Sequence, residues 1–225
     1  MTPPLAVDID GTLTDADSAV DPRAFDVLRE WNGPVVVATG KALPYPVALC
    51  QYAGIPANVI AENGGIAYAD RSDDLVVVGD RTASQAVADA YEAAGYDLGW
   101  GRTDLVNRWR ETEVAVSRES PLEPLERIAE DHGLEVVDTG FAYHVKSADV
   151  SKGRALSAVA ERLGRDPGEF VAVGDSVNDV STFGAAGRSY AVANADEAAR
   201  AAADVVVEGR YAEGFFDAVD LIAAE

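Results

Sequence analysis

Short apolar segments separated by helical patterns constrain the fold of this 225-residue chain more than any other feature. Near the N-terminus these segments occupy residues 5–9, 34–39 and 58–61, and helical patterns lie between them at about 22–31 and 44–53. Strands that are apolar along their whole length, and that are joined by helices, are typical of a parallel sheet covered on both faces. The pattern therefore predicts an α/β protein.

The last third of the chain repeats this alternation. It contains a helical pattern at 151–163, an apolar segment at 170–173 and a second helical pattern at about 177–185. Two more apolar segments follow near 190–193 and 205–207. Because both ends of the chain carry the same alternation, we expect them to form one doubly wound, Rossmann-like parallel sheet.

The middle of the chain follows a different pattern. Its apolar segments are short and partly alternating, which is typical of an antiparallel sheet with one exposed face. The expected strands are 75–78, 113–117, 135–137 and 141–146, and the expected helices are about 83–94 and 122–132. We therefore expect residues 1–74 and 151–225 to form an α/β core, and residues 75–150 to form an α+β domain inserted into it.

The chain is strongly acidic, with 39 Asp and Glu against 18 Lys and Arg and a net charge of −21. Such a surface repels phosphate backbones and anionic lipids, so we expect neither nucleic acid nor membrane partners. The chain shows no long apolar run or signal-peptide pattern, and its single Cys50 cannot form an internal disulfide, which favours the cytoplasm. Acid excess with only three lysines is typical of salt-loving organisms, and an acidic mesophilic protein is the alternative.

Two carboxylates follow the first apolar segment, in the sequence Asp8-Ile9-Asp10-Gly11-Thr12. Ligands of open α/β sheets bind at the carboxyl ends of strands, and side chains two positions apart on a strand share a face. Close carboxylates raise each other's pKa unless a cation lies between them, and Mg²⁺ prefers oxygen ligands. We therefore interpret Asp8 and Asp10 as parts of a magnesium site, with a calcium-like acidic loop or a helix cap as the alternative.

A second acidic pair follows the apolar segment at 170–173. Asp175 comes directly after the segment, and Asp179 lies one helical turn further on, next to Asn178. Taken alone, these acids could serve only as a helix N-cap and a first-turn acid. Because they would emerge at the same edge of the sheet as the first pair, we expect them to be metal ligands, with Asn178 in support.

Two further features are typical of phosphate binding. Thr39-Gly40 ends the second apolar segment, where a hydroxyl and backbone N–H groups could hold a phosphate oxygen, although Thr is also a common strand residue. Lys152 opens a predicted helix, and a cation at the positive end of the helix dipole costs stability unless an anion is near. We therefore expect Thr39, Gly40 and Lys152 to face an anion.

In this order, the four motifs resemble those of the haloacid dehalogenase superfamily of aspartate-nucleophile phosphohydrolases. They are DIDGT, Thr39-Gly40, Lys152 at a helix start, and GDSVND. The inserted domain, the ENGG turn before it and the GFAYHVKSADVSKG stretch after it are similar to the type-2 capped members, and most of all to archaeal phosphoglycolate phosphatases. The resemblance covers essentially the whole chain and identifies the inserted domain as a cap.

The resemblance implies a Mg²⁺-dependent phosphomonoester hydrolase. Asp8 would attack phosphorus, and Asp10 would act first as general acid and then as general base. The implied metal ligands are Asp8, the Asp10 main chain, Asp175 and Asp179. The implied phosphoryl-binding residues are Thr39, Gly40 and Lys152.

The substrate implied by the resemblance is 2-phosphoglycolate, a small phosphorylated metabolite whose carboxylate would need a cation. His144 and Lys146 alternate onto one face of the last cap strand and are candidates for this role, although either could instead be structural or solvated. Substrates of the sucrose-phosphate or mannosyl-3-phosphoglycerate type remain alternatives, as does a non-catalytic ligand-binding protein on the same fold. The sequence leaves both a monomer and a homodimer open.

Overall fold

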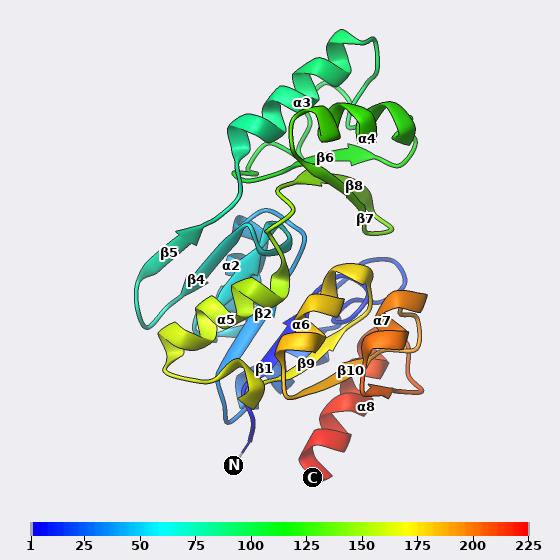
Figure 1. Ribbon diagram of the computed structural model, residues 1–225. Coiled ribbons are helices and arrows are strands. Elements are labelled where there is room, and N and C mark those ends of the chain that lie inside the picture. The colour runs from blue at the N-terminus through cyan, green and yellow to red at the C-terminus, as the bar shows by residue number, and fades with distance from the viewer. Residues whose placement is uncertain (1, 225) are drawn as a thin grey trace.

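The computed structural model describes residues 2–224, and its dominant feature is an eight-stranded sheet (Figure 1). The strand order is β11-β10-β9-β1-β2-β3-β4-β5, and the strands from β11 to β3 are parallel. These parallel strands are β1 (Leu5–Asp8), β2 (Val35–Ala38), β3 (Val59–Ala61), β9 (Val171–Gly174), β10 (Arg188–Ala191) and β11 (Val205–Val206). The expected doubly wound α/β sheet is confirmed.

The order of the strands places a binding edge between β1 and β9. From β1 the chain winds outward through β2 and β3, and the later part winds the other way through β9, β10 and β11. β1 and β9 are neighbours, with Leu5 opposite Val171, so the winding direction changes between them. Ligands of open α/β sheets bind outside the carboxyl ends of the strands at such a point.

Helices cover both faces of this sheet. Alternate residues of β1 face opposite layers, so that Leu5 and Val7 pack in one apolar cluster and Ala6 in another. The first layer contains α1 (Pro22–Glu30), α2 (Pro44–Ala53) and α8 (Tyr211–Ala224), and the second contains α5 (Lys152–Leu163), α6 (Val180–Ala185) and α7 (Glu197–Ala202). A short 3₁₀ turn, η2 (Pro167–Glu169), precedes β9. Cys50 is buried in the first layer.

A second, antiparallel sheet lies beyond the binding edge of the first, at the top of Figure 1. Its order is β6-β8-β7, with β6 (Val114–Ser117), β7 (Glu135–Asp138) and β8 (Ala142–Lys146). Helices α3 (Arg81–Ala93) and α4 (Leu122–Asp131) pack on one face against Val114 and Val145. Because side chains alternate along β8, His144 lies on the opposite face from Val145.

The strand expected at 75–78 does not belong to the second sheet, and that assignment was wrong. β4 (Ile66–Ala69) and β5 (Asp74–Val77) form a hairpin that pairs antiparallel with β3 and extends the large sheet. The chain reverses directly after β3 in the 3₁₀ turn η1 (Glu62–Gly64). Gly64 has a φ of 104°, and a Cβ there would lie 2.2 Å from the carbonyl oxygen of Ser151, so this turn requires glycine.

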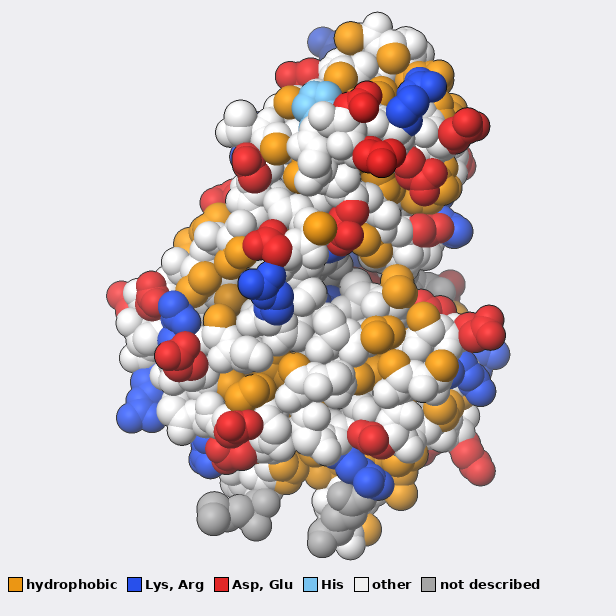
Figure 2. Space-filling view, viewed as in Figure 1, with side chains coloured by type: hydrophobic (Ala, Val, Ile, Leu, Met, Phe, Trp, Pro, Cys, Tyr) orange, Lys and Arg blue, Asp and Glu red, His pale blue; other side chains and the backbone are white. Residues whose placement is uncertain are grey.

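Acidic side chains are spread over the molecule. Figure 2 shows them over the helices of the second sheet and over the large sheet, interspersed with Arg, Lys and apolar groups. A charge distribution of this kind is typical of a solvated surface. Within residues 2–224, no helix combines the length and the apolar character that a membrane crossing needs.

We expect the thermal stability of the protein to rise steeply with KCl concentration. A net charge of −21 repels itself in dilute buffer, and the Debye length falls from about 10 Å at 0.1 M salt to about 3 Å at 1 M. A gain of about 2 kcal/mol would raise the Tm by roughly 4–8 °C in a chain of this size. Calorimetry in low and in molar KCl checks this, and a flat or falling Tm would contradict it.

Candidate active site

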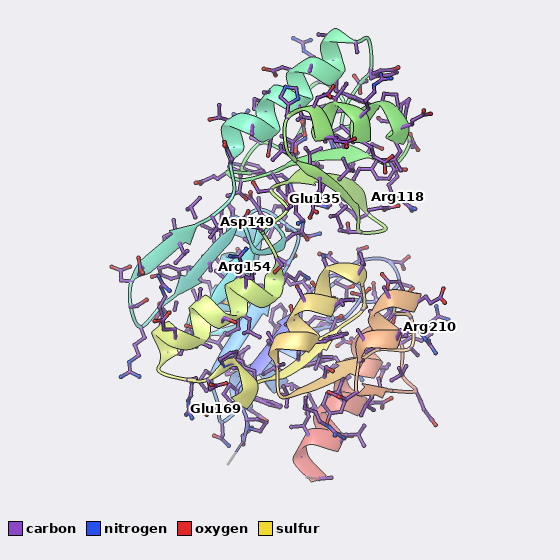
Figure 3. The ribbon with its side chains drawn as sticks, in the orientation of Figure 1. Arg118, Glu135, Asp149, Arg154, Glu169 and Arg210 are labelled. Carbon is purple, nitrogen blue, oxygen red and sulfur yellow. The ribbon has the colours of Figure 1, made fainter. Side chains whose placement is uncertain are left out.

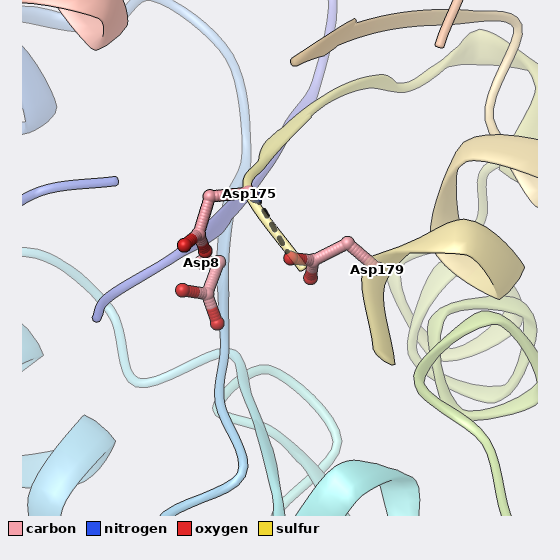
Figure 4. A group of neighbouring side chains, drawn as sticks. All are labelled: Asp8, Asp175 and Asp179. Atoms are coloured by element: carbon pink, nitrogen blue, oxygen red, sulfur yellow. Dashed lines mark hydrogen bonds between the residues drawn. The ribbon is translucent and has the colours of Figure 1, made fainter. Parts of the chain in front are cut away.

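Three carboxylates meet where β1 and β9 end. Asp8 is the last residue of β1, Asp175 follows β9, and Asp179 ends the short 3₁₀ turn η3 (Val177–Asp179). One carboxylate oxygen of each residue lies within 4.8 Å of the others, and Figure 4 shows the three side chains converging. The strand order therefore brings together acids from opposite ends of the sequence.

This cluster holds more negative than positive charge. Burial is the largest cause that raises the pKa of Asp8, the charges of Asp179 and Asp10 raise it further, and Lys152 lowers it. Burial and the charge of Asp8 also raise the pKa of Asp175. Both groups therefore hold a proton more tightly than an isolated aspartate, and a bound cation would favour their ionised forms.

Lys152 lies at the centre of the cluster. It is the first residue of α5, follows the N-cap Ser151 and is fully buried. Its Nζ donates to Asp8 Oδ1 at 2.7 Å, to Asp179 Oδ1 at 2.8 Å and to Asn178 Oδ1 at 2.9 Å. Burial alone would lower the pKa of Lys152, but Asp179 and Asp8 raise it above its usual range. The lysine is therefore held in its charged form.

Backbone groups and a glycine fix the positions of the acids. Oδ2 of Asp179 accepts hydrogen bonds from the N–H groups of Asp175 at 3.0 Å, dashed in Figure 4, and of Ser176 at 3.1 Å. Gly11 has a φ of 81°, and a Cβ there would lie 2.1 Å from Asp175 Oδ2. The glycine of the first motif thus lets its loop pack directly against an acid of the last motif.

A cavity of about 430 Å³ opens between this cluster and the second sheet. The predicted site residues in its lining are Asp8, Asp10, Gly40, Asp175, Asn178 and His144. Thr39 is fully buried and lies outside the lining, with its Oγ1 accepting the N–H of Lys41 at 3.1 Å. Thr39 therefore shapes the loop that carries Gly40.

Lys41 is a cavity residue that the sequence did not single out. Its Nζ donates to Asp10 Oδ1 at 2.8 Å and lies 5.4 Å from the ring centre of Phe141. Phe141 belongs to the loop between β7 and β8, so Lys41 contacts both the core and the second sheet. The available signal was its position directly after Thr39-Gly40 in a chain with only three lysines.

Known proteins identify the family of this chain. A model of the haloacid dehalogenase-like hydrolase family matches residues 5–96 and 119–219, which is most of the chain. The chain belongs to the haloacid dehalogenase-like hydrolases. The family resemblance of the four sequence motifs is therefore confirmed.

Individual relatives of this hydrolase extend the match over nearly its whole length. A phosphoglycolate phosphatase of Halobacterium salinarum is 64% identical over 220 residues, which cover 98% of this chain and 97% of that protein. A phosphoglycolate phosphatase of Archaeoglobus fulgidus is 38% identical, covering 97% of this chain and 96% of that one. The crystal structure of protein 0175 from Thermoplasma acidophilum shares the fold over both whole chains, with a TM-score of 0.82 and 24% identity. Relatives from halophilic archaea agree with the acidic composition.

The structure of this hydrolase separates the two cap candidates. His144 lines the cavity that Asp8 faces, and Lys146 does not. Lys146 lines a neighbouring cavity of about 420 Å³, where its Nζ bonds to the Glu135 carboxylate, labelled in Figure 3, and to the carbonyl oxygen of Val150 at 2.8 Å. Its charge is already paired, which removes the basis for expecting it to bind a substrate carboxylate at Asp8.

The donor set fits a hard divalent cation. Asp8, Asp175 and Asp179 supply carboxylate oxygens close together, and the cluster contains no sulfur or nitrogen ligand. Lys152 and two backbone N–H groups already bind Asp179, which leaves Asp8 and Asp175 as the less occupied ligands. Oxygen-only sites suit hard cations better than softer metals, and the use of a divalent metal is general among the phosphatases of this family.

Proposed function

We propose that this hydrolase is a Mg²⁺-dependent phosphomonoester phosphatase with Asp8 as its nucleophile and 2-phosphoglycolate as its substrate. The observation that carries the proposal is Asp8 itself, a buried carboxylate at the winding change that is paired with Lys152 and faces a cavity of about 430 Å³. Relatives that are 55–64% identical and are named phosphoglycolate phosphatases support the substrate.

In the first step, an Asp8 oxygen attacks phosphorus and forms a new O–P bond while the bond from phosphorus to the ester oxygen breaks. Asp10 donates a proton to the departing alkoxide, which leaves as glycolate. In the second step, Asp10 takes a proton from a water molecule whose oxygen attacks phosphorus. The bond to Asp8 breaks, phosphate leaves, and the Asp8 carboxylate is restored. The contact with Lys41 orients Asp10 for both proton transfers.

The groups around Asp8 hold the phosphoryl group during these steps. Lys152 donates to the nucleophile and compensates charge on the phosphoryl oxygens. Asn178 bonds to Lys152 and lines the cavity, while Thr39 holds the loop that presents backbone N–H groups near Gly40. Fixed donors of this kind cost no reorganisation when charge develops in the transition state.

Asp8 and Asp175 would hold the metal, with Asp179 and the main chain of Asp10 in support. When bound, Mg²⁺ supplies charge stabilisation for the transferring phosphoryl group. The raised pKa values of Asp8 and Asp175 agree with this assignment, because burial and, after it, the neighbouring carboxylates disfavour the ionised forms, which a bound cation would favour.

A substrate panel in molar KCl tests the proposed substrate. We expect kcat/KM for 2-phosphoglycolate to exceed that for sucrose 6-phosphate, mannosyl-3-phosphoglycerate and p-nitrophenyl phosphate by at least about tenfold. A higher value for one of the sugar phosphates would move the assignment to that substrate. Phosphate release from none of them, with Mg²⁺ present, would favour a ligand-binding protein.

Chelation is expected to abolish activity, and added Mg²⁺ is expected to restore it. Since the pKa values of Asp8 and Asp175 are raised, the metal-free cluster carries protons near neutral pH that Mg²⁺ must displace. Uptake of Mg²⁺ should therefore release protons and should tighten as pH rises. Calorimetry in buffers of different ionisation enthalpy measures the release. Full turnover after exhaustive EDTA treatment would contradict this prediction.

We further propose that the core and the cap are separate domains of one cytoplasmic enzyme that acts on a small metabolite. The sequence places the cap at 75–150 between the core segments 1–74 and 151–225. Because β5 extends the large sheet, a first boundary after Val77 fits the structure better. Closure of the cap over Asp8 would exclude water and favour the transfer of the phosphoryl group to Asp8.

A further inference from the structure

A buried cluster of charged residues forms part of the cap wall of the Asp8 cavity. Glu113, just before β6, has a side chain with no exposed surface, and Arg110 and His144 are almost as deeply buried. The Glu113 carboxylate accepts from Arg110 Nη1, from His144 Nδ1 at 2.8 Å and from Asn63 Nδ2 at 2.9 Å. Burial alone would raise the pKa of Glu113, but His144 and Arg110 lower it, so this carboxylate is ionised.

The contact with Glu113 fixes which nitrogen of His144 faces the cavity. An ionised carboxylate only accepts hydrogen bonds, so Nδ1 is the donor and Nε2 is the nitrogen left for another partner. Within residues 2–224, Nε2 makes no hydrogen bond, and the one fully buried side-chain polar atom without a partner there is Thr182 Oγ1. Nε2 is therefore accessible, and the ring lines the Asp8 cavity.

Arg110, on the same wall of the Asp8 cavity, also has one nitrogen bonded to Glu113 and another without a partner among the described residues. Its Nη1 donates to Glu113 and to the carbonyl oxygen of Gly40 at 2.9 Å, and its Nε donates to the carbonyl oxygen of Val106 at 3.1 Å. Nη2 has no partner among the described residues and is likewise not sealed from solvent. Arg110 therefore presents a permanent donor to the cavity next to His144.

Hydrogen bonds connect this cluster to Lys152 in the active site. Asn63 accepts from Asn178 Nδ2 at 2.9 Å, and Asn178 in turn accepts from Lys152 Nζ at 2.9 Å. A continuous chain of hydrogen bonds thus runs from Glu113 through Asn63 and Asn178 to the lysine that holds Asp8. This chain fixes the distance between the cap donors and the nucleophile, as recognition of one small substrate requires.

We propose that Arg110 and His144 are the specificity-determining residues that bind the carboxylate of the substrate's leaving group, with Glu113 positioning both. The proposal rests on the proposed function, because it assumes a phosphate ester that carries a second anionic end. His144 donates to this carboxylate through Nε2 when both of its ring nitrogens carry protons, and Arg110 Nη2 supplies a second donor to the same carboxylate. The carboxylate then lies on the cap wall, away from the acids that surround the phosphoryl group.

Two His144 variants distinguish binding of the substrate carboxylate through Nε2 from the structural hydrogen bond between Nδ1 and Glu113. In His144→Asn the amide nitrogen takes the place of Nδ1 and keeps the bond to Glu113, but nothing replaces Nε2. In His144→Gln the amide nitrogen takes the place of Nε2 and the bond to Glu113 is lost. We expect His144→Asn to lower kcat/KM for 2-phosphoglycolate by more than about tenfold, and His144→Gln to retain more of it.

The control substrate is the carboxamide analogue of 2-phosphoglycolate, which has the same size and no second charge. Its kcat/KM should change by less than about threefold in His144→Asn, so that the preference for the carboxylate is lost. Equal losses on both substrates, or no loss on either, would overturn this proposal in an enzyme that is active on 2-phosphoglycolate. A wild-type enzyme inactive on 2-phosphoglycolate would instead refute the proposed function and this assignment with it.

Arg110 needs a paired variant, because its removal alone would leave the buried Glu113 carboxylate without its guanidinium partner. The double variant Arg110→Gln with Glu113→Gln removes both charges and keeps polar side chains of similar length. We expect it to fold with a Tm near that of the wild type and to lose the preference for 2-phosphoglycolate over the carboxamide. A folded double variant that keeps the full preference would show that Arg110 does not bind the carboxylate.

Discussion

Asp8→Asn is expected to lower kcat by more than about four orders of magnitude while the protein keeps its fold. An amide cannot replace the carboxylate as a nucleophile, and two of the neighbouring acids are engaged, Asp10 with Lys41 and Asp179 with Lys152. Turnover of 2-phosphoglycolate at saturating Mg²⁺ in molar KCl measures the effect.

Asp220→Asn is the matched control, because it makes the same change of charge at an exposed position on α8. We expect its kcat to stay within about twofold of the wild-type value. An Asp8→Asn enzyme that turns over as fast as this control would contradict the covalent mechanism with Asp8 as nucleophile.

Lys152→Met is expected to lower kcat by a factor of about 10²–10³ and the free energy of unfolding by about 3–5 kcal/mol. The substitution removes a fully buried cation that bonds to Asp8, Asp179 and Asn178, and it leaves two buried carboxylates without their partner. Denaturant unfolding in Mg²⁺-free buffer measures the stability, since a bound cation would mask part of the loss.

Lys146→Met provides the comparison, because Lys146 is also buried and paired with a carboxylate, but its partner Glu135 lies outside the Asp8 cluster. We expect this variant to lose stability and to keep kcat within about threefold of the wild-type value. Equal losses of kcat in both variants would show that Lys152→Met acts through the stability of the fold. An unchanged kcat in Lys152→Met would show that Lys152 does not contribute to catalysis.

The convergence of Asp8, Asp175 and Lys152 could be predicted because it depends on local features. Each residue lies at the end of an apolar strand or at the start of a helix, and parallel strands bring their carboxyl ends to one edge of the sheet. The strand β5 was assigned to the wrong sheet, because a short strand of this kind can pair with either sheet and the turn at Gly64 decides which.

The roles of His144 and Lys146 could not be separated by sequence alone. Alternation correctly places both on one face of β8, but the cross-strand register pairs Lys146 with Glu135 and His144 with Val137. Glu135, opposite Lys146, forms an ion pair with it. Val137, opposite His144, is apolar, so His144 bonds instead with Glu113 from elsewhere in the cap. Such partners are set by tertiary contacts that no local pattern encodes.

The central claim is the covalent intermediate on Asp8, and trapping it is the most direct test. The enzyme is acid-quenched during turnover of 2-phosphoglycolate, treated with borohydride and digested, and the peptide that contains residue 8 is examined by mass spectrometry. An acyl phosphate is reduced to the alcohol, so the account predicts homoserine at position 8 only in samples that contained substrate and Mg²⁺. Unmodified Asp8 in an enzyme quenched at full turnover, or homoserine at another aspartate, would contradict it.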